Sequence, residues 1–117
     1  MKKPQALASL SALAQENRLD TFRLLVQAGP EGMPAGEVAA RLSISPNNLT
    51  FHFDKLRQAG LVTVRREGRS MIYAARYDAM NALLGYLTEN CCEGAAATCA
   101  APSCEPTTPR KRVKERA

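Results

Sequence analysis

The chain has 117 residues, of which 45% are hydrophobic, and it carries a net charge of +5 at pH 7. A chain of this length forms one domain, with short tails at most. No stretch approaches the ~18 consecutive apolar residues of a membrane-spanning helix, so we expect a soluble protein that binds no membrane.

The first residues resemble a signal peptide, because two lysines precede an apolar stretch. Leucines recur in that stretch at helical spacing, with serines between them, so we predict an amphipathic helix over residues 5–14 instead. Its apolar face consists of Leu7, Leu10 and Leu13. Without a targeting segment we expect a cytoplasmic protein, in which the four cysteines stay reduced.

Three further helices are predicted from the spacing of apolar residues. They span residues 17–28, 35–42 and 46–59. In the first of the three we expect four buried side chains, namely Leu19, Phe22, Leu25 and Val26. Gly29–Pro30 ends that helix, because proline cannot continue it.

Residues 34–62 contain two of these helices joined by a tight turn, which is the layout of a helix-turn-helix. Ser45 is expected to cap the second helix, and Pro46 occupies its first position, where a missing N–H costs nothing. The face opposite the apolar stripe is rich in amides at its N-terminal end, which suits a helix that enters a major groove. A solvated face in any small helical protein is the alternative. Contacts with base edges or the groove wall are expected from Asn47, Asn48, Thr50 and Phe51.

His52, the only histidine, borders the apolar stripe of the same helix. We expect its ring to pack against the core, as single histidines on such a border usually do. A contact with a DNA phosphate is the alternative role for this side chain.

After Gly60 the apolar pattern changes from helical to β. Leu61–Arg66 and Ser70–Ala74 predict the two strands of a hairpin, with a turn between them. Six basic side chains and one acidic side chain lie between Lys55 and Arg76. A helix-turn-helix followed by a hairpin with a basic tip is a winged helix, and cations of this kind bind DNA phosphates. Phosphate contacts are expected from Lys55, Arg65, Arg66 and Arg69.

A last helix is predicted from Asp78 to Asn90. Its apolar face consists of Met80, Leu83, Leu84 and Leu87. Together with the leucines of the first helix, this face exceeds what so small a core can cover, and an exposed apolar patch marks an interface. We therefore expect a homodimer formed by the first and last helices, whose symmetry places two recognition helices about one DNA turn apart. The expected fold is mainly α with a small β-hairpin, in a domain of residues 1–90.

Residues 91–117 lack a periodic apolar face, so we expect a flexible tail ordered through its cysteines. Cys91, Cys92 and Cys99 can converge as a three-sulfur site. Thiolates select thiophilic ions, and three sulfurs suit As(III) or Sb(III), whose lone pair favours a pyramid.

Three alternatives to this metalloid site remain. Zinc prefers four ligands in a tetrahedron, and a four-cysteine site that includes Cys104 is the second possibility, although the usual CxxC pairs are absent. Redox sensing by the thiols is the third, and it requires a thiolate stabilised by nearby positive charge. Four inert thiols are the last.

The chain resembles the ArsR/SmtB family of dimeric winged-helix repressors over about residues 5–90. The matching segments are Asn17-Arg18-Leu19, Glu37-Val38-Ala39, Leu49–Phe53, Ala59–Val62 and Arg66–Arg69 with Tyr73. The resemblance implies that the metal-free dimer binds an operator and that an inducer ion releases it. Many members bind their ion through a CxC motif in the third helix, but Met33–Glu37 contains no cysteine. The last helix also lacks the histidines of the family's zinc site.

The remaining thiols are similar to those of an As(III)-responsive subgroup with cysteines after the last helix. This resemblance implies an As(III) site at Cys91 and Cys92, with either Cys99 or Cys104 as the third ligand. We therefore expect a repressor of an arsenic-resistance operon that needs no cofactor to bind double-stranded DNA. A Zn(II)- or Cd(II)-responsive repressor and a thiol-redox-responsive one are the alternatives of the same fold. A thiol-dependent enzyme is disfavoured, because no anion-binding glycine-rich loop accompanies a cysteine.

Overall fold

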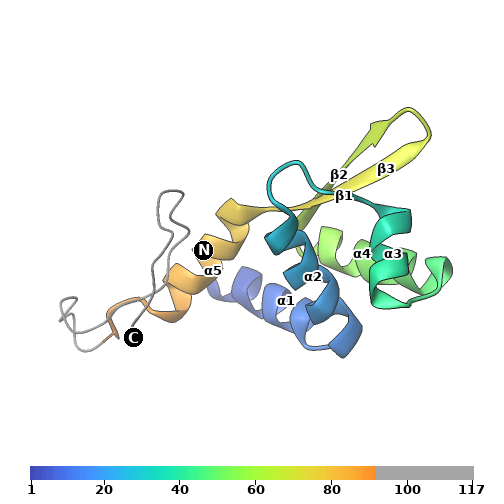
Figure 1. Cartoon of the computed structure of the whole chain (residues 1–117). Coiled ribbons are helices and arrows are strands. Elements are labelled where there is room, and N and C mark those ends of the chain that lie inside the picture. The colour runs from blue at the N-terminus through green and yellow to red at the C-terminus, as the bar shows by residue number, and fades with distance from the viewer. Residues whose placement is uncertain (92–117) are drawn as a thin grey trace, which may run out of the picture. The chain divides into compact units, whose positions relative to one another are not determined.

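The computed structural model describes residues 1–91, and the chain divides into two units between Leu87 and Thr88 (Figure 1). The first unit, Met1–Leu87, contains five helices and a three-stranded antiparallel sheet. Its helices are α1 (Lys3–Leu13), α2 (Glu16–Ala28), α3 (Ala35–Leu42), α4 (Pro46–Gln58) and α5 (Tyr77–Leu87). Its strands are β1 (Met33–Pro34), β2 (Val62–Glu67) and β3 (Ser70–Ala75). This architecture confirms the predicted winged helix-turn-helix.

The start of α4 follows the predicted capping chemistry. The Ser45 side-chain oxygen accepts a hydrogen bond from the Asn48 backbone N–H (3.3 Å), and Pro46 is the first residue of the helix. Ser43, in the turn after α3, adopts a left-handed conformation with φ of 55°. The two helices are therefore joined as the helix-turn-helix pattern predicts.

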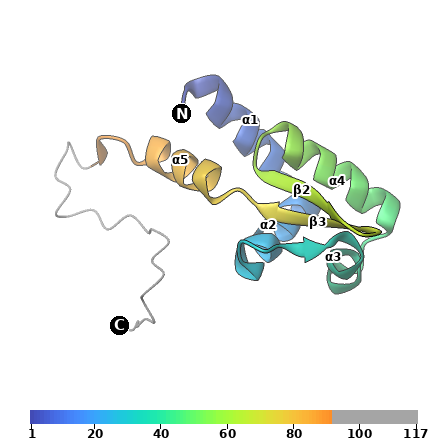
Figure 2. The same ribbon diagram turned by 90° about the horizontal axis from the view of Figure 1, so that it is seen from above.

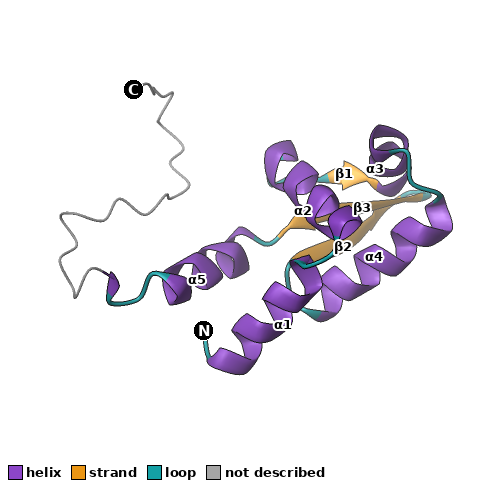
Figure 3. Ribbon diagram, turned by 90° about the horizontal axis from the view of Figure 1, so that it is seen from below, coloured by secondary structure: helices purple, strands orange, loops and turns teal. Residues whose placement is uncertain are grey.

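The core lies where α2, α3 and α4 meet the sheet. Its most deeply buried large side chains are Leu25, Val38, Leu49, Phe53, Leu56 and Leu61. In addition, α2 contacts β3 and α4 contacts β2 (Figure 3). The ring of Phe53 stacks on that of Tyr73, with centroids 3.6 Å apart and planes 5° apart. This stack fixes α4 against β3.

β1 was not predicted, and it changes the hairpin into a three-stranded sheet with the order β1–β3–β2. Met33 of β1 pairs with Tyr73, which on its other side pairs with Val64 of β2. At Gly32 (φ +80°) a Cβ would lie 2.3 Å from the Tyr73 carbonyl oxygen, so only glycine permits this close approach. A strand of two residues, one of them proline, has no alternation that the sequence could reveal.

Two expectations about the helices need correction. Leu19 is 43% exposed rather than buried, because α2 turns its Phe22 and Leu25 face toward the core. The last helix ends at Leu87 rather than Asn90, which has a left-handed φ of 58°. In α1, Leu7 and Leu10 are exposed, as expected for an interface, and the helix packs inward through small side chains (Ala6, Ser9 and Ala12).

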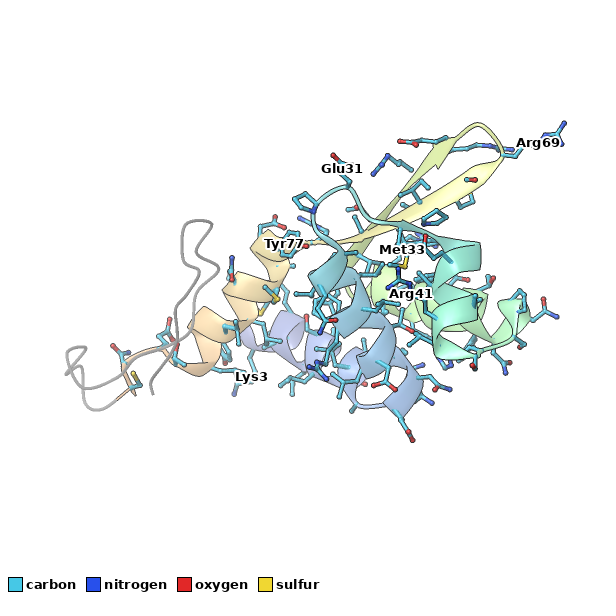
Figure 4. The ribbon with its side chains drawn as sticks, viewed as in Figure 1. Lys3, Glu31, Met33, Arg41, Arg69 and Tyr77 are labelled. Atoms are coloured by element: carbon cyan, nitrogen blue, oxygen red, sulfur yellow. The ribbon has the colours of Figure 1, made fainter. Side chains whose placement is uncertain are left out.

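The start of α5 is fixed by a long-range hydrogen bond, in which the Tyr77 hydroxyl donates to the Val26 carbonyl oxygen (2.9 Å). Figure 4 shows Tyr77 at the beginning of α5, near the end of α2. None of the described helices is both long and apolar enough to cross a bilayer.

Candidate nucleic-acid interface

The N-terminal half of α4 carries a polar, exposed face. The residues predicted to meet bases, Asn47, Asn48, Thr50 and Phe51, are all exposed. The side-chain amides of Asn47 and Asn48 make no hydrogen bond to residues 1–91, so their donors and acceptors are available to base edges. The Thr50 hydroxyl instead donates to the Pro46 carbonyl oxygen (3.0 Å), which commits its proton to the helix backbone.

Phe51 is the exception on this polar face, since its aromatic side chain is 54% exposed. The Lys55 Nζ atom lies 5.3 Å from the centroid of the Phe51 ring. The His52 ring meets Phe51 edge-on, with centroids 5.8 Å apart and planes 66° apart. Phe51 is therefore held by neighbours on both sides while its ring stays open to solvent.

The three arginines of the hairpin are not equivalent. Arg65 Nε lies 2.8 Å from the Glu67 carboxylate, and Arg66 Nε donates to the Gly68 carbonyl oxygen (3.3 Å). Arg69 makes no ion pair or side-chain hydrogen bond to the described part of the chain, and Figure 4 shows it projecting from the hairpin tip. Arg69 is therefore the most available of the three for a phosphate, whereas Arg65 shares its charge with Glu67.

The fold brings these two groups of predicted residues to one end of the first unit. The N-terminal end of α4 and the tip of the β2–β3 hairpin lie at this same end in two perpendicular views, with the tip standing above the helix in Figure 1 (Figures 1 and 2). A small cavity of about 150 Å³ lies between α3, the N-terminal half of α4 and β3, and its lining includes Thr50, Met71 and Tyr73. Met71 was not predicted as a site residue. The signal was the alternation along β3, where Ile72 and Ala74 are buried and Met71 is exposed.

Comparisons with known proteins agree with this geometry. Residues 13–65 match the helix-turn-helix domain family. The chain is 35% identical over 77 residues to the uncharacterized HTH-type transcriptional regulator YceK of Bacillus subtilis. The aligned residues make up 65% of this chain and 76% of YceK. The structure of HlyU from Vibrio cholerae aligns with a TM-score of 0.60 and 33% identity, over 74% of this chain and 97% of HlyU.

A solution structure from Mycobacterium bovis extends the comparison. It is a homodimeric winged helix-turn-helix domain of a possible ArsR-family regulator, and it aligns with a TM-score of 0.61 and 26% identity over 78% of this chain and 84% of that one. The chain belongs to the helix-turn-helix transcriptional regulators, and its winged-helix fold resembles that of the possible ArsR-family domain. It is a DNA-binding regulator of transcription. Because the second helix of a helix-turn-helix enters the major groove, α4 with the β2–β3 hairpin is the candidate surface for DNA.

In this helix-turn-helix regulator His52 is a packing residue, since only 7% of it is exposed. Its Nδ1 atom is buried and has no hydrogen-bond partner among the described residues. Burial, and then the positive charge of Arg18, lower the pKa of His52 below its ordinary value of 6.5. These observations favour a neutral, packed ring. The phosphate contact stays a prediction.

Of the four cysteines of the regulator, only Cys91 lies among the described residues. It is partly buried, and its backbone N–H donates to the Thr88 carbonyl oxygen (3.0 Å) within the second unit. Cys92, Cys99 and Cys104, like the predicted tail as a whole, lie outside the described residues. Within residues 1–91 no three histidine, cysteine or acidic side chains are grouped as a metal site. The metalloid site at the cysteines therefore stays a prediction.

Proposed function

We propose that this regulator represses an arsenic-resistance operon and leaves its operator when As(III) or Sb(III) binds Cys91, Cys92 and Cys99, with Cys104 as the alternative third ligand. The observation that carries the proposal is the clustering of all four cysteines in residues 91–104, directly after the winged-helix unit. Thiolates in a short segment can close around one thiophilic ion. Each As–S bond would replace an As–OH bond of arsenite, and the thiol proton would leave with the hydroxide as water.

The proposal includes a homodimer formed by α1 and α5. These helices contact each other, and they expose Leu7, Leu10 and Leu87. The M. bovis relative with the same fold is homodimeric. Since Cys91 follows α5 in the chain, an ion held by these thiols would be linked through the backbone to the helix that joins the subunits.

The switch requires differential binding by the inducer. Moving operator occupancy from 99:1 to 1:99 takes ~5.5 kcal/mol. Two sites of three metalloid–sulfur bonds, one site in each protomer, are strong enough to supply this difference. An inducer that bound equally well to the free and DNA-bound dimers would shift nothing.

A thiol-redox response is the second candidate. One structure of the V. cholerae relative is of reduced HlyU, with a TM-score of 0.58 and 31% identity. In that mechanism an oxidant would join two of the cysteines, and a dithiol reductant would restore operator binding. A Zn(II)- or Cd(II)-responsive site with four thiolates would use the same cysteines.

The test is a titration of the full-length regulator on duplex DNA from its own upstream region. Arsenite, antimonite, Zn(II), Cd(II) and a thiol oxidant are added separately, and operator binding is followed by fluorescence anisotropy. We expect release by arsenite or antimonite at concentrations where the other additions have no effect. Release by Zn(II) and Cd(II) alone, or by the oxidant alone, would replace the proposal with one of its alternatives.

Variants of single cysteines locate the site. Cys91→Ser should bind the operator as tightly as the wild type. Its release from the operator should require at least tenfold more arsenite. Cys99→Ser and Cys104→Ser form a matched pair, and only the one that supplies the third ligand should lose release. Unchanged arsenite release in Cys91→Ser would exclude this thiol from the site.

A further inference from the structure

We infer that Phe51 reads the C5-methyl group of a thymine in the major groove, and that Lys55 and His52 hold its ring in position to do so. The inference rests on DNA binding by α4 and adds the chemical identity of a base that the regulator recognises. It is independent of the inducer.

The first step is the exposure of Phe51 on a face that is otherwise polar. Its neighbours one turn away are the exposed Asn47 and Asn48 and the half-exposed Asp54, which pairs with Arg57. Exposure of a phenyl ring to water is unfavourable, because the free energy falls when apolar surface is removed from solvent. The ring is therefore placed to be covered by a partner.

The second step is the chemistry of the surface that α4 meets. In the major groove the base edges display hydrogen-bond donors and acceptors, and the thymine methyl is the apolar group among them. A phenyl ring cannot accept or donate in the base plane as an amide does. Its favourable contact in the groove is therefore with a thymine methyl.

The third step is the support of the ring. The Lys55 ammonium lies 5.3 Å from the ring centroid, and the buried His52 meets the ring edge-on at a centroid distance of 5.8 Å. A cation over the face and a packed ring at the side restrict the Phe51 side chain before DNA arrives. Little conformational entropy is then lost when the ring contacts the base.

The neighbouring amides define the sequence around that thymine. Asn47 and Asn48 precede Phe51 by about one helical turn, so they share its face. Asparagine pairs in bidentate fashion with the N6 and N7 atoms of adenine. The half-site read by α4 therefore contains A·T pairs, with a thymine methyl beneath Phe51 and an adenine beside it.

The experiment replaces each thymine of the operator half-sites by uracil, one at a time, which removes the methyl group and keeps every hydrogen-bonding atom. Dissociation constants are measured by fluorescence anisotropy with the full-length regulator and no inducer. We expect one position per half-site at which uracil weakens binding about fourfold, the value of one buried methyl group, and about 15-fold when both half-sites are changed.

Phe51→Ala should bind the thymine and uracil duplexes equally at that position. Because Phe51 is exposed, this variant should keep the thermal midpoint of the wild type, so a loss of folding cannot imitate the result. Gln58→Ala, a change at another exposed residue of α4, is the matched control and should keep the full preference for thymine.

Two outcomes would overturn the inference, and they are distinguishable from failure of the proposed function. If no uracil position weakens wild-type binding, or if Phe51→Ala keeps the preference, the methyl contact is wrong although operator binding stands. If the regulator does not bind its upstream DNA at all, both the interface and this inference fail. A missing arsenite response leaves the inference intact.

Discussion

His52 makes the stability of this fold depend on pH, because its ring is buried in the neutral form. Burial and the charge of Arg18 lower its pKa in the folded state, so the unfolded chain binds a proton more readily. The stability that comes from the neutral ring is complete above about pH 6.5 and falls as the pH drops toward the folded-state pKa. We expect a slope of at most ~1.4 kcal/mol per pH unit in the free energy of unfolding, measured by urea titration between pH 5 and 8.

His52→Leu should remove this dependence, because leucine has no group to titrate and no unpaired Nδ1 atom. The pKa of Asp78 is lowered mainly by its hydrogen bond with Arg76, so its contribution to stability is lost only as the pH falls below the ordinary carboxyl pKa of about 4. The pH ranges in which His52 and Asp78 affect stability are therefore separate. If His52→Leu shows the same slope of unfolding free energy against pH as the wild type between pH 5 and 7, another group causes the pH dependence. The same variant tests the phosphate contact, since packing alone leaves operator affinity at a fixed salt concentration and pH unchanged, whereas loss of a hydrogen bond to a phosphate weakens it.

At the scale of the element, the hairpin is a basic surface in which one acidic side chain, Glu67, competes with DNA phosphates for an arginine. Glu67 neutralises part of Arg65, whereas Arg69 makes no ion pair within residues 1–91. We expect Arg69→Ala to reduce the slope of log K against log[salt] by about 0.9 per protomer, the value of one phosphate contact. Arg65→Ala is the matched control and should reduce it less, because its charge is already shared. Operator titrations between 50 and 300 mM salt make the comparison, and equal losses would mean that DNA displaces Glu67.

The elements differ in how far the sequence reveals them. The helix-turn-helix and the hairpin were predicted because their signals are local: Ser45 and Pro46 begin α4, and β-branched residues follow Gly60. β1 was missed because it depends on Gly32 approaching Tyr73, which is distant in the sequence. The exposed face of α4 was predicted from helical spacing, whereas the pairing of Arg65 with Glu67 depends on side-chain geometry that composition does not encode.

At the scale of the whole molecule, the first unit leaves leucines uncovered on two helices that contact each other. α1 packs through small side chains, so Leu7 and Leu10 stay 59% and 40% exposed, and Leu87 of α5 is 55% exposed. Exposed apolar side chains on neighbouring helices favour burial against a second subunit. The exposed leucines of α1 therefore agree with the interface that the sequence predicts.

The dimer is tested by placing a charge in this patch. We expect Leu10→Glu to give a monomer at micromolar concentration in sedimentation velocity, because two carboxylates would have to be buried across the symmetry axis without partners. Operator affinity should fall by 10²–10⁴-fold, since each recognition helix then binds without the effective concentration that its partner provides. Leu19→Glu is the matched control, because Leu19 is equally exposed but lies on α2, and it should stay dimeric. If Leu10→Glu remains a dimer with normal operator affinity, α1 does not form the interface, and any coupling between the cysteines and DNA must use other surfaces.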